Sequence, residues 1–136
     1  MALNQRIHGK GGQIKIDTAG GVSLVELADM NQWTLDMSTD RVVVTAFGDT
    51  NVRRVSGLPD YAGTLGAWWN AATAPTYFSA VLAGTPVTLR LIENRNDPTV
   101  YHQGLANIDG SISVSATGAV SYTGKWDAAG NWSFAF

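Results

Sequence analysis

Apolar side chains recur at every second position over most of this chain, and this spacing constrains the fold more than any other feature. Alternation places apolar side chains on one face of a β-sheet and polar side chains on the other. It recurs at Ile14 and Ile16; at Trp33, Leu35 and Met37; at Val42, Val44 and Ala46; at Val87, Leu89 and Leu91; at Ile112 and Val114; at Val120, Tyr122 and Trp126; and at Trp132, Phe134 and Phe136. Turn-forming pairs such as Gly48-Asp49 and Asp109-Gly110 separate these stretches. The chain is therefore expected to be mainly β, with antiparallel strands joined by turns.

One short segment breaks this two-residue period. Its apolar residues fall on a single helical stripe, formed by Tyr77, Phe78, Val81 and Leu82. Gly84 and Pro86 follow the stripe as stop signals. We predict one helix over residues 75–83, with Thr73 as its N-cap, covering one flank of the sheets. The expected architecture is an antiparallel β-sandwich or partly open barrel with one short flanking α-helix.

Length and composition indicate a single domain over residues 1–136, with a Gly-rich, flexible N-terminal arm at residues 1–11. Charged residues make up only 15% of the chain and the net charge is −2, so no basic excess is present to neutralise phosphates. The chain contains 0 Cys, which excludes disulfides and favours folding in a reducing compartment. No apolar stretch approaches the ~20 residues of a membrane helix, so membrane insertion is not expected.

Residues that could perform chemistry are few and scattered. The histidines are His8 and His102, and the carboxylates occur singly with no metal-binding loop spacing. We therefore expect no catalytic residues, metal site or cofactor, and no enzymatic activity. Trp68 and Trp69 form the most conspicuous pair; in a strand their indoles point to opposite faces, so at most one of them belongs to this chain's own core.

Several short motifs appear in a fixed order along the middle and end of the chain. Trp33-Thr34-Leu35-Asp36 is followed by Phe47-Gly48-Asp49, by the run from Gly57-Leu58-Pro59-Asp60 to Trp68, by Ala83-Gly84-Thr85-Pro86-Val87, and by serine-rich strands from Ser111 to Phe136. This order resembles the tail tube (major tail) proteins of long-tailed bacteriophages and prophages, over about residues 12–136. Trp69-Asn70 departs from the family pattern, which has a smaller or acidic residue beside the tryptophan.

The resemblance implies a structural virion protein without enzymatic activity. In that family, inner sheets of six subunits join into a continuous β-barrel, and the rings stack into a tube through which DNA passes. It implies a homo-oligomer that meets other tail proteins: the tape measure, terminator and distal tail proteins, and the sheath where a tail has one. DNA would be in transit through the lumen rather than bound. The protein would be found in the phage tail after assembly in the bacterial cytoplasm.

The resemblance also indicates candidate site residues. The loop from Asp49 to Ser56 would reach a neighbouring subunit or ring, where Arg53 and Arg54 could pair with Asp97 or Glu93. The expected subunit or ring interface consists of Asp49, Thr50, Asn51, Arg53, Arg54, Trp68 and Trp69. The candidate lumen face consists of Ser111, Ser113, Ser115, Ser121 and Thr123, whose short hydroxyls would line a wet wall. The alternative is that these hydroxyls form an ordinary solvent face.

Two other functions stay open from the sequence. A secretion-system tube of the Hcp-like kind shares the inner-barrel mechanism. A carbohydrate-binding β-sandwich would use Trp68 or Trp69 as an aromatic platform for a sugar. A small β-sandwich enzyme is disfavoured because no catalytic set converges.

Overall fold

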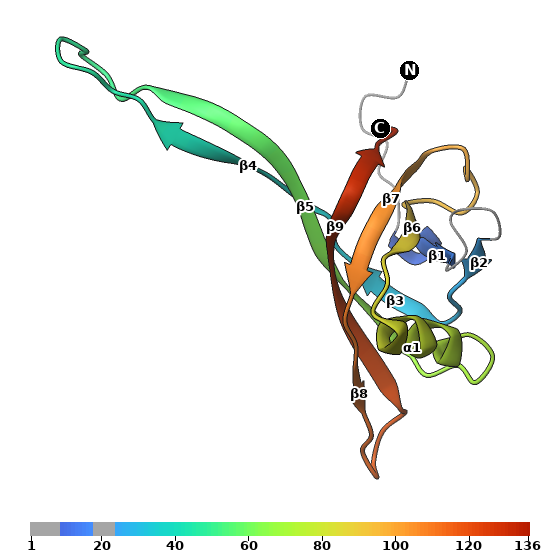
Figure 1. Ribbon diagram of the computed structural model, residues 1–136. Helices are drawn as coiled ribbons and strands as arrows, with labels where there is room; N and C mark the ends of the chain where they lie inside the picture. Colours follow the sequence, from blue (N-terminus) through green and yellow to red (C-terminus); the bar gives the residue numbers. More distant parts are fainter. Residues whose placement is uncertain (1–8, 18–23) are drawn as a thin grey trace.

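The computed structural model describes residues 9–17 and 24–136, and it is a single curved antiparallel sheet with one helix (Figure 1). A short 3₁₀ turn, η1 (Gly9–Gly11), precedes the sheet. The strands are β1 (Gln13–Asp17), β2 (Val25–Glu26), β3 (Met30–Trp33), β4 (Asp36–Val43), β5 (Arg54–Trp68), β6 (Val87–Ile92), β7 (Tyr101–Ile108), β8 (Ser111–Ser113) and β9 (Ser121–Ser133). The helix α1 (Ala74–Ala83) lies between β5 and β6.

The strands run in the order β2-β1-β6-β7-β9-β5-β3, while β4 pairs with β5 and β8 pairs with β9. All of the pairings are antiparallel. The sheet curls so far that β3, at one end of the order, approaches β1 near the other end. The result is a half-barrel, which confirms the expected mainly β, partly open barrel with one flanking helix.

The core fills the inside of this half-barrel, and the two-residue alternation explains which residues form it. Ile14 and Ile16 of β1 and Leu89 and Leu91 of β6 point inward and are fully buried. Leu65, Ala106, Tyr122 and Trp126 extend the same core across β5, β7 and β9. The expected hairpin between Ser111 and Lys125 is also present, since Ile112 of β8 lies opposite Tyr122 of β9.

Helix α1 lies on one flank of the half-barrel and begins one residue before the expected start at 75. Gly84 adopts a left-handed conformation with φ of 70° and ends the helix, as its sequence position predicts. Thr73 occupies the N-cap position, as predicted, but its side chain makes no hydrogen bond to the first turn of the helix. Its hydroxyl instead accepts a hydrogen bond from the backbone N–H of Ala28 at 3.1 Å, so it ties the helix to the segment before β3.

Tyr77 anchors α1 to the sheet. Its ring is buried, and its hydroxyl donates a hydrogen bond to the backbone carbonyl of Asp109, after β7. Burial, together with the neighbouring Tyr122 and Asp109, raises the pKa of Tyr77 well above its usual range. Burial, followed by the effect of Asp29, also raises the pKa of Tyr122.

These raised pKa values predict an alkaline loss of stability. A tyrosine with a raised pKa in the folded state stabilises the fold fully below the unfolded pKa of about 10, and this contribution is lost as the pH rises further. Urea unfolding should therefore show a free energy of unfolding that falls above about pH 10. Tyr77→Phe should lower the free energy of unfolding by about 1 kcal/mol near neutral pH, because the hydrogen bond to Asp109 is lost. It should also make the alkaline fall in this free energy less steep. The fall that remains in the variant would come from Tyr122. An alkaline decline of equal slope in both proteins would contradict this assignment.

Candidate assembly surfaces

A long two-stranded ribbon projects from the half-barrel (Figure 1). β5 is 15 residues long, but β9 pairs with it only from Ala62 onward. The remainder of β5, from Arg54 to Tyr61, pairs only with β4. Both outer edges of this ribbon therefore lack a strand partner in the described parts of the chain. An isolated two-stranded ribbon is marginally stable in water, and open edges are templates for pairing with another chain.

The ribbon is also apolar where it projects. Phe47 at its end is fully exposed, and Leu58 has 86% of its surface exposed. The other exposed apolar residues of the ribbon are Met37, Val42, Val43, Val44, Val52 and Val55. So many exposed apolar side chains on one projecting element are unusual for a monomer and indicate a surface that another chain could cover.

The ribbon tip, residues 44–53, is an ordered turn. Asp49 accepts a hydrogen bond from the backbone N–H of Ala46 at 2.8 Å, and the backbone N–H of Arg53 donates to Thr45 Oγ1 at 3.0 Å. Gly48 has a φ of 92°, a conformation that favours glycine. The turn is therefore held in shape before it meets any partner.

The interface residues expected in the loop after Phe47 lie at or beside this tip. Asp49, Thr50, Asn51 and Arg53 are in the turn, and Arg54 begins β5. The expected loop from Asp49 to Ser56 is too long at its C-terminal end, because β5 continues to pair with β4 as far as Arg54. Residues 54–56 are therefore strand rather than loop.

Trp68 and Trp69 point to opposite sides, as predicted. Trp68 ends β5 and remains 50% exposed. Trp69 packs inward, with ring centroids 5.7 Å from Phe78 and 6.2 Å from Tyr122. Trp68 is thus the indole of the pair that lies outside the core of this chain.

Four neighbouring strands share a polar face on the side of the sheet away from the core. Leu65, Tyr122 and Trp126 point into the core, so the residues beside them on β5 and β9 point the other way. β4 and β8 add to this face because their residues lie directly opposite those of β5 and β9. The polar face consists of Asp36, Ser38, Asp60, Thr64, Trp68, Ser111, Ser113, Ser121, Thr123, Lys125 and Asp127.

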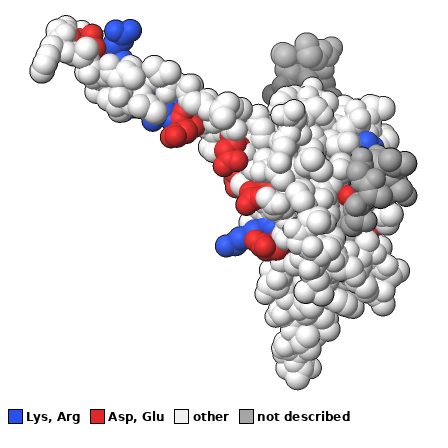
Figure 2. All heavy atoms as spheres, in the orientation of Figure 1, with Lys and Arg blue, Asp and Glu red and all other residues white. Residues whose placement is uncertain are grey.

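The polar face carries more negative than positive charge. Three carboxylates, those of Asp36, Asp60 and Asp127, share it with the amine of Lys125. Figure 2 shows acidic groups following one another along the ribbon into the body of the protein. Such a wall repels phosphate.

Four of the five expected lumen residues lie together on this polar face. They are Ser111, Ser113, Ser121 and Thr123, which pair across β8 and β9. Ser115 lies in the exposed turn that follows β8, where its carbonyl accepts a hydrogen bond from Gly118. The four hydroxyls on β8 and β9 therefore lie together, whereas the Ser115 hydroxyl lies apart from them in the turn.

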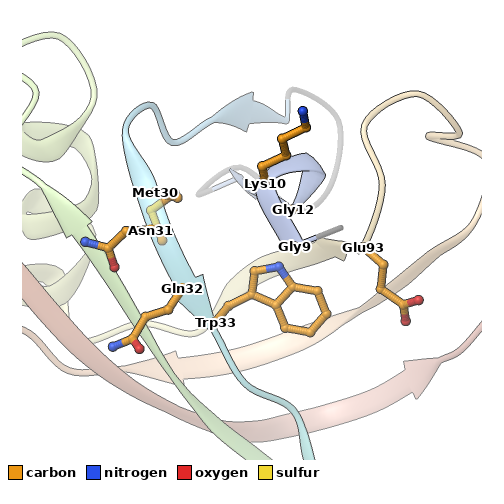
Figure 3. A pocket seen from close by; sticks show the side chains of 8 residues that line it. All are labelled: Gly9, Lys10, Gly12, Met30, Asn31, Gln32, Trp33 and Glu93. Atoms are coloured by element: carbon orange, nitrogen blue, oxygen red, sulfur yellow. The ribbon is translucent and has the colours of Figure 1, made fainter. Parts of the chain in front are cut away.

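A hollow of about 730 Å³ lies between β3, η1 and the end of β6 (Figure 3). It is lined by Gly9, Lys10, Gly12, Met30, Asn31, Gln32, Trp33 and Glu93. No sequence motif pointed to this hollow, because its residues come from three separate segments. Gly12, at one wall, donates its backbone N–H to the carbonyl of Gly9 at 3.0 Å. The rest of the expected N-terminal arm, including His8, lies outside the described residues.

Glu93 at the edge of this hollow binds a buried histidine. His102 of β7 is 1% exposed and its Nε2 lies 2.7 Å from Glu93 Oε1. The rings of Phe134 and Phe136 lie over the imidazole, with centroids at 5.6 and 5.0 Å. His102 therefore has a structural partner within its own chain.

Within residues 9–17 and 24–136, no group of three or more His, Asp or Glu side chains is placed to hold a metal ion. In this described region no helix is long and apolar enough to cross a bilayer, since α1 has 10 residues.

Solved structures with the same fold come from phage-like tails. A chain from the tail of an empty gene transfer agent (GTA) particle, refined with C6 symmetry, has a TM-score of 0.80 and 20% identity over 95% of this chain and 98% of that chain. The SPP1 tail tube has a TM-score of 0.74 and 15% identity over 92% of this chain and 77% of that chain. A chain from the baseplate of the anti-feeding prophage has a TM-score of 0.60 and 11% identity, covering 93% and 92% of the two chains.

No protein-family model and no curated protein matches the sequence. The structural likenesses confirm, at the level of the fold, the resemblance to tail tube proteins that the ordered motifs indicate.

Proposed function

We propose that this chain, which has the fold of tail tube proteins, is a structural tail tube subunit that assembles with copies of itself. One observation carries the proposal: the ribbon projects with two open strand edges and an exposed apolar surface. A monomer gains nothing from such a ribbon, whereas a ring of identical subunits pairs both edges and buries the apolar side chains.

The total surface of the monomer supports the same proposal. The chain exposes 9026 Å², whereas a compact monomer of this mass exposes roughly 6,800 Å². The excess of about 2,200 Å² is comparable to the area that a permanent subunit interface buries.

In the proposed tube, six subunits form each ring and the rings stack. The C6 symmetry of the GTA tail supports the number six. The polar face would line the lumen, because hydroxyls and carboxylates dominate it, beside one lysine and the one exposed indole of Trp68. DNA would pass through without tight binding, since counterion release drives phosphate binding and this face has few cations to supply it.

The expected partners and location of the protein follow from its proposed role as a tail tube subunit. The subunit would act without enzymatic chemistry and would meet other tail proteins at the ends of the tube, among them tape measure, terminator and distal tail proteins. It would be assembled in the bacterial cytoplasm and carried in the virion tail.

A related tube is the second candidate. The likeness to the anti-feeding prophage baseplate favours a tube of an injection or secretion device, built by the same edge pairing. The assembly experiment below applies to both candidates, and the neighbouring genes would separate them.

Assembly of the purified protein tests the proposal. Size-exclusion chromatography at increasing concentration, followed by negative-stain microscopy, should show loss of monomer and the appearance of six-fold rings or tubes. A protein that stays monomeric at every concentration, with a protease-resistant ribbon, would contradict the proposal.

A further inference from the structure

The hollow beside β3 combines an aromatic wall with a carboxylate. Trp33 and Met30 come from β3, and Glu93 comes from the segment after β6 on the opposite rim. Figure 3 shows the Trp33 indole and the Glu93 side chain at the same opening. Met30 and Trp33 also pack against the core, so the apolar wall is held in place from behind.

Glu93 is held in one orientation while remaining accessible. Nδ1 of His102 is buried and lacks a hydrogen-bond partner among the described residues, so the proton of the neutral imidazole belongs on Nε2. Nε2–H then donates to Glu93 Oε1 at 2.7 Å. The Glu93 side chain is still 43% exposed, and a carboxylate accepts several hydrogen bonds, so it has capacity for a second donor.

The ribbon tip presents the complementary groups. Phe47 is fully exposed, and the Arg53 side chain is 68% exposed with a loose ion pair of 3.8 Å to Asp49. The tip of the same chain lies at the far end of the ribbon, so it does not fill its own hollow (Figure 1). An occupant from a second copy is therefore the one that this chain can supply.

The structure also distinguishes between Asp97 and Glu93, the two carboxylates that the sequence offers as partners for an arginine. Asp97 lies in an exposed turn, where Thr99 Oγ1 donates to it at 2.6 Å, and it is not among the residues that line the hollow. Glu93 lies beside an apolar wall large enough for an aromatic ring. Of these two carboxylates, Glu93 is therefore the one that could receive the arginine while the phenylalanine of the same tip lies against an apolar wall.

We propose that the hollow receives the ribbon tip of a second copy, with Phe47 against Trp33 and with Arg53 bound to Glu93, which His102 positions. This inference rests on the proposed tube function and names the contact between subunits. The ordered tip reduces the entropy lost on docking, and the arginine–carboxylate pair sets the register of the contact.

Cysteine cross-linking tests the contact directly, because the chain has 0 Cys. Thr50→Cys in the tip and Gly9→Cys at the hollow, where an added side chain meets no atom within 4 Å, would be made in separate proteins, mixed, assembled and oxidised. The mixture should give a disulfide dimer on a non-reducing gel. Thr50→Cys mixed with Thr117→Cys, in the exposed turn between β8 and β9, is the matched control and should give at least about tenfold less.

The outcomes distinguish this inference from the proposed function. Tubes without the disulfide between positions 50 and 9 would overturn the docking contact and leave the tube function standing. Absence of tubes in every protein, wild type included, would overturn the proposed function.

Charge reversal tests the named pair. Arg53→Glu and Glu93→Arg should each raise the concentration needed for assembly by at least about tenfold, and the double variant should recover most of this loss. Arg54→Glu is the control for charge, since it makes the same change one residue away. Equal effects of Arg53→Glu and Arg54→Glu, without rescue, would overturn the pairing.

The positioning role of His102 has its own test. His102→Gln retains a side-chain N–H for Glu93, whereas His102→Leu removes it. The two variants should differ in cross-linking yield, with glutamine the closer to wild type, after correction for the melting temperature of each monomer. Equal yields would show that His102 serves only the core.

Discussion

Val43→Pro should leave the monomer folded and abolish its assembly into tubes. Val44 donates its backbone N–H to the carbonyl of Arg53 at 2.8 Å, toward β5. Because N–H groups alternate sides along a strand, the N–H of Val43 points to the open edge of β4. Proline removes that donor and blocks strand addition without breaking the ladder between β4 and β5.

The expected contrast is large and simple to measure. The free energy of unfolding of the monomer should change by about 1 kcal/mol or less, because the position is exposed. Negative-stain microscopy should show no rings or tubes at concentrations where the wild type forms them. Val43→Thr is the matched control, since it retains the N–H and the β-branched shape and should assemble. Tubes of normal length from Val43→Pro would exclude the β4 edge as a pairing surface.

The inside of the half-barrel could be predicted from the sequence because the alternation of strands is a local property. Ile14 with Ile16, and Leu89 with Leu91, share a face whatever their neighbours are. The end of the helix was predictable for a similar reason, since Gly84 allows the left-handed conformation that closes it. These features depend on a few adjacent residues.

The ribbon could not be told apart from a core strand by the same reasoning. Val42 and Val44 alternate with neighbours as core residues do, yet both are exposed. Burial depends on which strands pair, and within the described part of the chain no strand covers these valines. An apolar strand without a partner in its own chain is therefore visible only in the structure.

The hollow and the position of Glu93 beside it could not be predicted from the sequence, for a related reason. Glu93 directly follows β6 and His102 lies in β7, nine positions later, and only the register of the β6–β7 hairpin brings them together. Sequence reasoning named Glu93 as one of two partners for an arginine. The choice between Glu93 and Asp97 required the position of Trp33, which is about sixty residues distant in the chain.

Gly63→Ala should be strongly destabilising, because the ribbon leaves the body of the protein at this residue. Gly63 of β5 lies opposite Trp126 of β9. A methyl group at Gly63 would overlap the carbonyl oxygen of Thr34 and would lie 2.8 Å from the Trp126 indole nitrogen. Thr34 cannot withdraw easily, since its backbone N–H donates to the carbonyl of Thr64 at 2.8 Å.

The overlap should cost about 2–3 kcal/mol of unfolding free energy, the upper part of the range for overpacked sites, and should lower the melting temperature by roughly 10 °C. Gly118→Ala is the control, since a methyl group there meets no atom within 4 Å and should change stability by about 1 kcal/mol or less. Because the backbone shift would also redirect the ribbon, any folded Gly63→Ala protein should assemble poorly even below its melting temperature. Normal stability with normal tubes would show that the junction of β3 and β4 tolerates movement that its close packing opposes.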